Sequence, residues 1–415
     1  MKQKLNLAVM GLALVCFSPI AKAVNNAPAD ADTVTLRMSC TEGATQIPNC
    51  FETMAAVDIW LRTVRMTGLT KPTLVNISPG NFDGWDCSSS YVTLKGAGRD
   101  RTILKGAIST NGGIDIHSGC TQINVQDLKI EGGGQGLGYG VYFDGSNNAL
   151  SAITSWTNVE ITAATYPWVE WSSSTAGACP AVRGKHSWFS SRIIARGTVS
   201  AARPYIAKCS ESWFWGSELS AEIPFQQNAT SAVIKAESGA EVHLYGSNVR
   251  LTIASGVNSD MISNRLIEAG GGSEIHIHGT GLDVIHDGTG TADMLYADST
   301  SHFHATASGF NIHVGGTGKV KRLAGTGRIE APYTWGERTS APLSTNPDGT
   351  PSSNGVGTLV SRNGADRYIE TDCQPSGNCS SGGGFPHDMV YLAACTGLAA
   401  NQGPWFDMTT KACRQ

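Results

Sequence analysis

Three short segments in the second half of the chain align with one another without a gap. They are EVHLYG at 241–246, EIHIHG at 274–279 and HFHATA at 302–307. The segment ESWFWG at 211–216 fits the same frame, and SWFS at 187–190 fits it more loosely. Successive frames begin about 25 to 33 residues apart, the length of one coil of two or three strands in a parallel β-helix.

The alternation within these segments predicts which side chains are buried. Successive side chains of a strand point to opposite faces, so every second residue of each segment would face a core. The residues expected to point inward are Val242, Leu244, Ile275, Ile277, Phe303 and Ala305. Similar β-rich segments broken by Gly, Asn and Ser extend over residues 74–329. We therefore expect an all-β solenoid over this region, each coil burying its inward residues against the next.

One stretch before this region has helical periodicity. In NCFETMAAVDIWLRTVRM (49–66), apolar residues recur at Met54, Val57, Leu61 and Val64. Asn49 can cap a helix, and Glu52 stands three residues later, as in a capping box. We expect an amphipathic helix that closes one end of the solenoid.

Two adjacent segments resemble a known family. TLVNISPGNFDGW (73–85), followed by YVTLKGAGRDRTILKG (91–106), is similar to the opening coils of the pectin lyase-like superfamily. The resemblance implies a right-handed parallel β-helix, and it concerns fold more than activity. The catalytic signatures of polygalacturonases, pectate lyases and pectinesterases do not occur in this sequence, so the resemblance supplies no catalytic residues.

The ends of the chain predict export and division into regions. Lys2 and Lys4 precede an apolar run and the small residues AKA (21–23), the pattern of a cleavable secretory signal. No later stretch is long and apolar enough to span a membrane, so we expect a secreted or periplasmic protein. The predicted regions are a signal peptide (1–23), an N-terminal cap (24–73), the β-helix (74–330), a Pro/Ser/Gly linker (331–355) and a small disulfide-bonded C-terminal module (356–415).

Removal of the signal takes Cys16 with it and leaves an even number of cysteines, which favours disulfides in an oxidising compartment. Neighbours in the sequence suggest five pairs, although other connectivities are open: Cys40 with Cys50, Cys87 with Cys120, Cys179 with Cys209, Cys373 with Cys379, and Cys395 with Cys413. A zinc site is the rival interpretation, but the sequence contains no CxxC pair.

The outward residues of the aligned segments would form columns on one face of the solenoid. The columns are Trp188, Trp213, His243, His276 and His304; Trp215, Tyr245, His278 and Thr306; and Glu211, Glu241, Glu274 and His302. Exposed aromatic rings stack on sugars, and Glu and His can hydrogen-bond to hydroxyl groups, so this face predicts carbohydrate binding. The alternative is that stacked rings only stabilise neighbouring coils, or that the C-terminal module covers them.

Two further hypotheses concern the same face. His243, His276 and His304 with a glutamate could bind a metal, but residues in a ladder point in parallel, whereas metal ligands must converge. Glycoside hydrolysis needs two carboxylates, which Glu241 and Glu274 could supply with His276 beside them. If the protein is an enzyme, we expect a polysaccharide lyase or glycoside hydrolase.

The charge balance excludes one class of partner. The net charge is -4, and 15% of residues are charged, so the sequence predicts no basic surface for nucleic acid. It predicts no cofactor. We expect recognition, and as a further hypothesis cleavage, of an extracellular or cell-envelope polysaccharide. The rival is a structural or adhesive surface protein without enzymatic activity.

Overall fold

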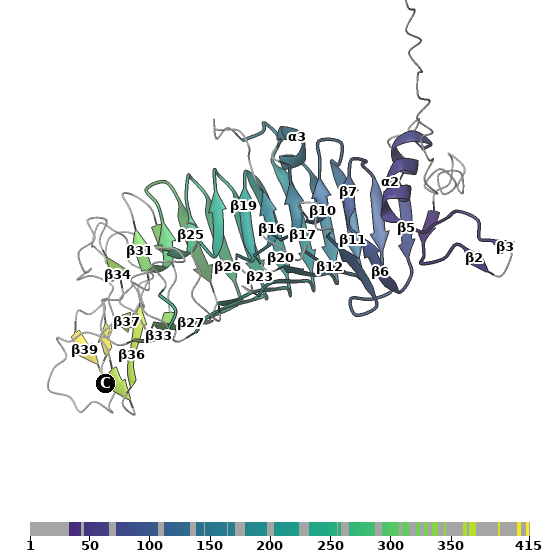
Figure 1. Ribbon diagram of the computed structural model, residues 1–415. Coiled ribbons are helices and arrows are strands. Elements are labelled where there is room, and N and C mark those ends of the chain that lie inside the picture. The colour runs from purple at the N-terminus through teal and green to yellow at the C-terminus, as the bar shows by residue number, and fades with distance from the viewer. Residues whose placement is uncertain are drawn as a thin grey trace, which may run out of the picture.

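The computed structural model of the chain is a parallel β-helix, in which the backbone winds through successive coils along one axis (Figure 1). Side chains are described from residue 33 to residue 304, apart from 43–44, 66–71, 107–111, 133–137, 145, 147–148, 164, 171–178, 197–202, 224–231, 255, 259–264 and 287–292; beyond 304 only the backbone of short strands is described. The expected secretory signal lies outside the described residues.

Each coil gives one strand to each of three parallel sheets. Sheet 1 begins with β4 (Cys50–Phe51) and β1 (Thr33–Leu36) and continues through β5 (Thr73–Ile77), β8 (Val92–Lys95), β11 (Gln122–Gln126), β14 (Ile153–Thr157), β17 (Gly184–Phe189), β20 (Ser210–Trp215), β23 (Glu241–Tyr245), β26 (Glu274–His278), β29 (His302–Thr306) and β32 (Arg328–Glu330).

Sheet 2 follows sheet 1 in each coil. Its parallel strands are β6 (Gly80–Asp83), β9 (Thr102–Lys105), β12 (Lys129–Glu131), β15 (Glu160–Ala163), β18 (Arg192–Ala195), β21 (Glu218–Ile223), β24 (Asn248–Ile253), β27 (Gly281–His286), β30 (Gly309–Val314) and β33 (Thr334–Arg338).

Sheet 3 completes each coil. Its strands are β7 (Trp85–Cys87), β10 (Gly112–Ile116), β13 (Tyr139–Phe143), β16 (Tyr166–Glu170), β19 (Tyr205–Lys208), β22 (Ile234–Glu237), β25 (Arg265–Ala269), β28 (Asp293–Ala297), β31 (Lys321–Leu323) and β34 (Ser344–Thr345).

The predicted register of sheet 1 is confirmed from β20 to β29. Glu211 pairs with Glu241, which pairs with Glu274, and Trp213, His243, His276 and His304 follow one another in the next column. The expected inward residues Val242, Leu244, Ile275, Ile277 and Phe303 are all buried. The side chain of Ala305 lies outside the described residues.

The prediction for Trp188 was wrong. Ser187, not Trp188, pairs with Trp213, while Trp188 pairs with the inward Phe214 and is 0% exposed. A shift of one residue in register moves a side chain to the opposite face of a sheet. Phe189, which pairs with Trp215, occupies the outward position instead.

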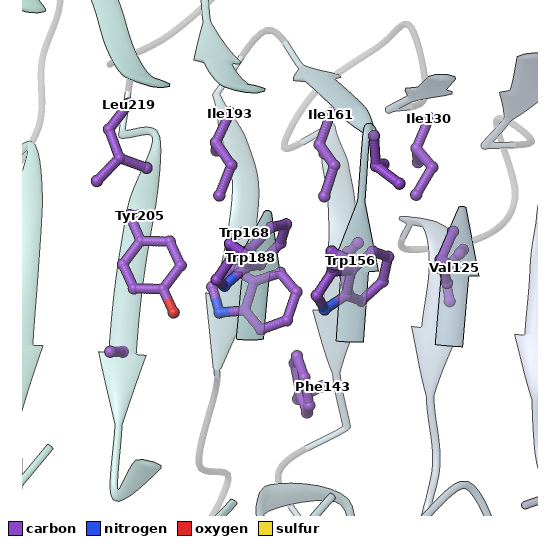
Figure 2. Close-up of a cluster of buried hydrophobic side chains, with 14 of the residues drawn as sticks. Val125, Ile130, Phe143, Trp156, Ile161, Trp168, Trp188, Ile193, Tyr205 and Leu219 are labelled. Atoms are coloured by element: carbon purple, nitrogen blue, oxygen red, sulfur yellow. The ribbon is translucent and has the colours of Figure 1, made fainter. Parts of the chain in front are cut away.

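Aromatic side chains fill the middle of the solenoid (Figure 2). Trp156 stacks on Trp188 at 5.1 Å between ring centroids, and Trp188 stacks on Phe214 at 5.4 Å. Trp168, from sheet 3, meets the ring of Trp188 edge-on at 4.8 Å. Such rings bury a large apolar area and prefer tilted or offset contacts, so they hold sheets 1 and 3 together across the core.

The predicted helix is present as α2 (Met54–Thr63), at the N-terminal end of the solenoid (Figure 1). Its apolar residues Met54, Val57 and Leu61 are buried. The expected cap was wrong: Thr53 caps the helix, since its hydroxyl accepts a hydrogen bond from the amide of Ala56 at 3.1 Å. Asn49 instead has φ 52°, and β4 follows it, so it lies before the helix.

Three of the predicted disulfides are confirmed. Cys40 bonds to Cys50, Cys87 to Cys120 and Cys179 to Cys209. The two predicted pairs in the C-terminal region lie outside the described residues.

The remaining elements are short. Near the N-terminus they are the hairpin of β2 (Thr41–Glu42) and β3 (Thr45–Gln46) and, further along, the helix α3 (Asn147–Leu150). Beside β33, β35 (Val360–Arg362) and β36 (Ala365–Glu370) pair antiparallel. A separate antiparallel sheet contains β37 (Met389–Val390), β38 (Trp405–Asp407) and β39 (Ala412–Arg414).

Parallel pairing continues past residue 330 into β33 and β34. Among the described helices, none has the length and apolar character that a membrane crossing requires.

Candidate functional site

The candidate site is the outer face of sheet 1 from β17 to β29, where outward residues form three columns. The outer ladder contains Phe189, Trp215, Tyr245 and His278; the middle column contains Trp213, His243, His276 and His304; and the edge column contains Lys185, Glu211, Glu241, Glu274 and His302. Because parallel strands lie about 4.8 Å apart, each column places one side chain directly above the next.

The outer ladder is a continuous stack of rings. Phe189 and Trp215 lie 4.7 Å apart between ring centroids with 8° between their planes. Trp215 and Tyr245 follow at 6.0 Å, and Tyr245 and His278 at 5.0 Å. Phe189 is 41% exposed and Trp215 36% exposed. A ligand lying along this ladder would meet ring edges, because neighbouring rings occupy most of the faces.

The middle column is also stacked. Trp213 lies 5.7 Å from His243, and His243 lies 4.6 Å from His276, both with nearly parallel planes. His276 and His304 lie 6.0 Å apart with a tilt of 55°. The two columns touch, since the rings of His243 and Tyr245 are 6.2 Å apart.

The edge column pairs acids with bases. Arg183 lies 2.9 Å from Glu241, and Lys185 lies 3.1 Å from Glu211. Glu274 contacts His276 at 2.8 Å between carboxylate oxygen and ring nitrogen. The Lys185 ammonium also lies 5.6 Å from the centroid of the Trp213 ring. Hydrogen-bonding groups of both signs therefore flank the aromatic rings.

Two histidines of the face have lowered pKa values. Burial lowers the pKa of His243, and the neighbouring His276 lowers it further, although Glu241 opposes both effects. Burial likewise lowers the pKa of His278, with added repulsion from His276 and His304. Both groups therefore favour the neutral form at neutral pH.

The structure brings together nine of the ten predicted site residues. Trp213, Trp215, His243, Tyr245, Glu241, Glu274, His276, His278 and His304 all lie on the outer face of sheet 1. Trp188 lies in the core. Phe189 was not among the predicted residues, although the turn after β17 could have revealed it. Ser190–Ser191 corresponds to Gly216–Ser217 and Gly246–Ser247, each at the same point of its coil.

A metal hypothesis receives no support from the geometry. Within the part of the chain that the structure describes, no three His, Cys, Asp or Glu side chains converge as a metal would need. The columns instead run parallel, as expected for neighbouring rungs of a sheet.

A second group of titratable residues, which was not predicted from the sequence, lies at the outer side of sheet 3. His117 is placed between two carboxylates, 2.6 Å from Asp86 and 3.0 Å from Asp144. Burial raises the pKa of Asp144, but hydrogen bonds from Ser146 and His117 outweigh burial and hold it below its usual range. Three consecutive coils contribute these residues, so no single segment of the sequence reveals the group.

This group adjoins a cleft between α2 and the first strands of sheet 3. The cleft has a volume of about 270 Å³ and is lined by Asp58, Arg62, Asp83, Asp86 and Asp115, among others. Burial raises the pKa of Asp58, although Arg62, at 2.7 Å, and Trp85 oppose the increase. The cleft is rich in carboxylates, so a polyanionic ligand would be repelled there.

Comparisons with known proteins found similarity among solved structures and none among sequences. No family model matches the chain, and no curated protein matches its sequence. Among solved structures, the A-module of mannuronan C-5 epimerase AlgE6 from Azotobacter vinelandii is similar, with 14% identity and a TM-score of 0.33 over 72% of this chain and 86% of that one. That degree of similarity supplies no site residue and no activity, and the pectin lyase-like resemblance stays an expectation from the sequence.

Proposed function

We propose that this protein binds a polysaccharide along the outer face of sheet 1. The observation that supports the proposal is the outer ladder, in which Phe189 and Trp215 keep 41% and 36% of their surface exposed. Soluble proteins rarely leave rings in a row open to water, and such patches mark binding sites. The rings of Tyr245 and His278 continue the row with polar atoms at their edges.

The dimensions of the ladder suit a polymer better than a single sugar. Four rungs at about 4.8 Å each extend for roughly 14 Å along the helix axis. A polysaccharide lying along this axis would place successive hydroxyl groups against the edges of successive rings.

The test is a binding screen of residues 24–415 against soluble neutral polysaccharides at pH 7.5. We expect the Trp213→Ala/Trp215→Ala double variant to lose at least tenfold in affinity, since each aromatic contact is worth about 1 kcal/mol. Ile153→Ala is the matched control, because Ile153 is an exposed apolar residue of the same sheet, 48% exposed, outside the ladder. Absence of binding by folded wild type would contradict the proposal.

Cleavage of the bound polymer is a second candidate function. Glu274 and His276 lie 2.8 Å apart, and Glu241 occupies the adjacent rung. Neighbouring rungs are about 4.8 Å apart, close to the roughly 5 Å between the two carboxyl groups of retaining glycosidases. If this proposal is correct, Glu274→Gln and Glu241→Gln each abolish product formation while binding persists. Unchanged product formation would refute it.

The rival proposal is a structural or adhesive protein without enzymatic activity. Stacked rings also stabilise neighbouring coils, so stacking by itself does not separate the two. The exposed surface of Trp215, together with that of the stacked Phe189, favours ligand binding, because adjacent exposed rings form an apolar patch. The disulfides Cys40–Cys50, Cys87–Cys120 and Cys179–Cys209 support the accompanying proposal of export to an oxidising compartment.

A further inference from the structure

Half of the histidines of this protein gather at one end of the candidate face. The chain has 10 histidines, and five of them, His243, His276, His278, His302 and His304, lie on β23, β26 and β29. We call these five the histidine cluster.

The rings of the cluster form one connected network. His276 is at its centre, with centroids 4.6 Å from His243, 6.1 Å from His278 and 6.0 Å from His304. His304 lies 5.8 Å from His278 and 5.6 Å from His302. Each of the five imidazoles has at least one other ring of the cluster as its neighbour, so protonation of the cluster would change the local charge by several units.

Among the residues that the structure describes, few other charges lie beside the histidine cluster. Glu241 and Glu274 stand in the edge column beside it, and Arg183 is paired with Glu241. Glu211 and Lys185, on the next strands, form a pair of their own. On the far side, Arg328 and Glu330 of β32 hold the next register positions, one of each sign. On the adjoining outer positions of sheet 2, Arg250 is the register partner of Asp283, again one of each sign.

The sign of the local charge therefore depends on pH. With neutral histidines, the two glutamates and Arg183 leave the region slightly negative. With protonated histidines, the same region is strongly positive, because five cations then outnumber Glu241 and Glu274 beside them and Glu330 at the next register position. Burial and mutual repulsion both oppose that protonation, and in that order they lower the pKa values of His243 and His278.

We propose that the histidine cluster becomes a binding site for the sulfate or carboxylate groups of an acidic polysaccharide when the pH falls below that of neutral solution. Anions placed among the protonated rings relieve their repulsion, so binding and proton uptake favour each other. The inference rests on the proposed function only in assigning a polymer to this face. The aromatic half of the face, from Phe189 to Trp215, carries no histidine and keeps its character at both pH values.

The experiment compares dextran sulfate with uncharged dextran of the same length at pH 7.5 and pH 5.0. Sulfate groups stay ionised at both values, so a change in binding reports on the protein. We expect affinity for dextran sulfate to rise at least tenfold at pH 5.0, since each linked proton contributes up to about tenfold per pH unit. Binding of uncharged dextran should not rise, and 0.5 M salt should abolish the gain, because exposed charges are screened.

The variant His276→Gln/His278→Gln removes two rings from the network and should lose most of the pH-dependent gain. His117→Gln, which changes a histidine of sheet 3 that is 37% exposed, is the matched control and should keep it. Titration calorimetry of wild type in buffers of different ionisation enthalpy should also detect proton uptake on binding, without any variant. Equal affinity for dextran sulfate at both pH values, retention of the gain by the double variant, or absence of proton uptake would each overturn the proposal.

The Trp213→Ala/Trp215→Ala variant distinguishes failure of the histidine-cluster proposal from failure of the proposed polysaccharide binding. Trp213→Ala/Trp215→Ala should weaken binding of neutral polysaccharides at pH 7.5 and leave the acid-dependent gain for dextran sulfate in place. If this variant lost both neutral polysaccharide binding and the acid-dependent gain for dextran sulfate, the two ligands would share one site, and the proposal of a separate anion site would be wrong.

Discussion

Two ladders of rings run along sheet 1, one inside the solenoid and one outside, and both include residues of β17 and β20. The inner ladder is Trp156, Trp188 and Phe214, with centroid distances of 5.1 and 5.4 Å. The outer ladder runs from Phe189 to His278 with distances of 4.7 to 6.0 Å. The stacking is alike in both, but the inner rings are fully buried and the outer rings are partly open. Stacking is thus a property of parallel coils, and only exposure separates a binding surface from a core.

Each ladder also has a glutamate and a histidine beside it. Glu170 and His186, inside, lie 3.3 Å apart, and each side chain is 1% exposed. Glu274 and His276, outside, lie 2.8 Å apart at 44% and 19% exposure. The inner carboxylate accepts hydrogen bonds from the Trp168 indole and the Ser210 hydroxyl, which compensate its burial. A glutamate and a histidine in contact therefore form part of a buried hydrogen-bond network inside the solenoid and part of a solvent-exposed surface outside it.

Truncation of one ring in each ladder should give the largest contrast. Trp188→Ala leaves a cavity in the core and should lower the free energy of unfolding by about 3 to 5 kcal/mol. Trp215→Ala removes a partly exposed ring and should cost about 1 kcal/mol or less. Urea denaturation followed by circular dichroism measures both. Equal losses for the two variants would mean that the outer ladder is as structural as the inner one.

The difference between inward and outward residues also explains which strand registers could be predicted from the sequence. In β23 and β26, apolar inward residues alternate with polar or aromatic outward residues, and each strand is followed by a glycine with positive φ, Gly246 or Gly279, so the register is unambiguous. In β17 both Trp188 and Phe189 are aromatic, so alternation fits two registers one residue apart. The Ser190 turn, with φ 50°, decides between them.

The group around His117 could not be predicted from the sequence for a different reason. Asp86, His117 and Asp144 come from three coils, and their contacts depend on the stacking of β7, β10 and β13. The sequence in that region has no gap-free repeat that would place the coils in register. Local pattern therefore predicted the fold and the sheet 1 face, but it could not predict contacts that the coils create between distant segments.

Removal of the two carboxylates should give the second contrast. Glu170→Ala leaves the Trp168 indole and the amide of Lys208 without their acceptor, and should cost about 3 kcal/mol. Glu274→Ala should change stability by less than about 1 kcal/mol, because its pair with His276 is exposed to water. Thermal denaturation of both variants at pH 7.5 makes the comparison. A loss for Glu274→Ala as large as that for Glu170→Ala would show that the outer pair is structural.

The smallest effect expected is a loss of stability in mild acid that originates in the outer face. The pKa values of His243 and His278 are lowered in the folded protein, so the unfolded chain takes up protons first as the pH falls. Stability contributed by these neutral histidines is complete above about pH 6.5 and is lost as the pH falls from there to their lowered folded values. Since both side chains are partly solvated, the loss should total about 1 kcal/mol.

Urea denaturation of wild type and of His243→Gln/His278→Gln at pH 7.5 and 5.5 measures that loss. The free energy of unfolding of the double variant should decrease less between pH 7.5 and pH 5.5 than that of wild type. Trp188→Ala should be less stable at both pH values but should show the same decrease as wild type. Addition of dextran sulfate at pH 5.5 should restore the lost stability in wild type, because a bound anion favours the charged histidines that folding otherwise disfavours. If the double variant loses as much stability in acid as wild type does, the acid sensitivity arises elsewhere, and the buried pair of Glu170 and His186 beside the inner ladder becomes the next place to examine.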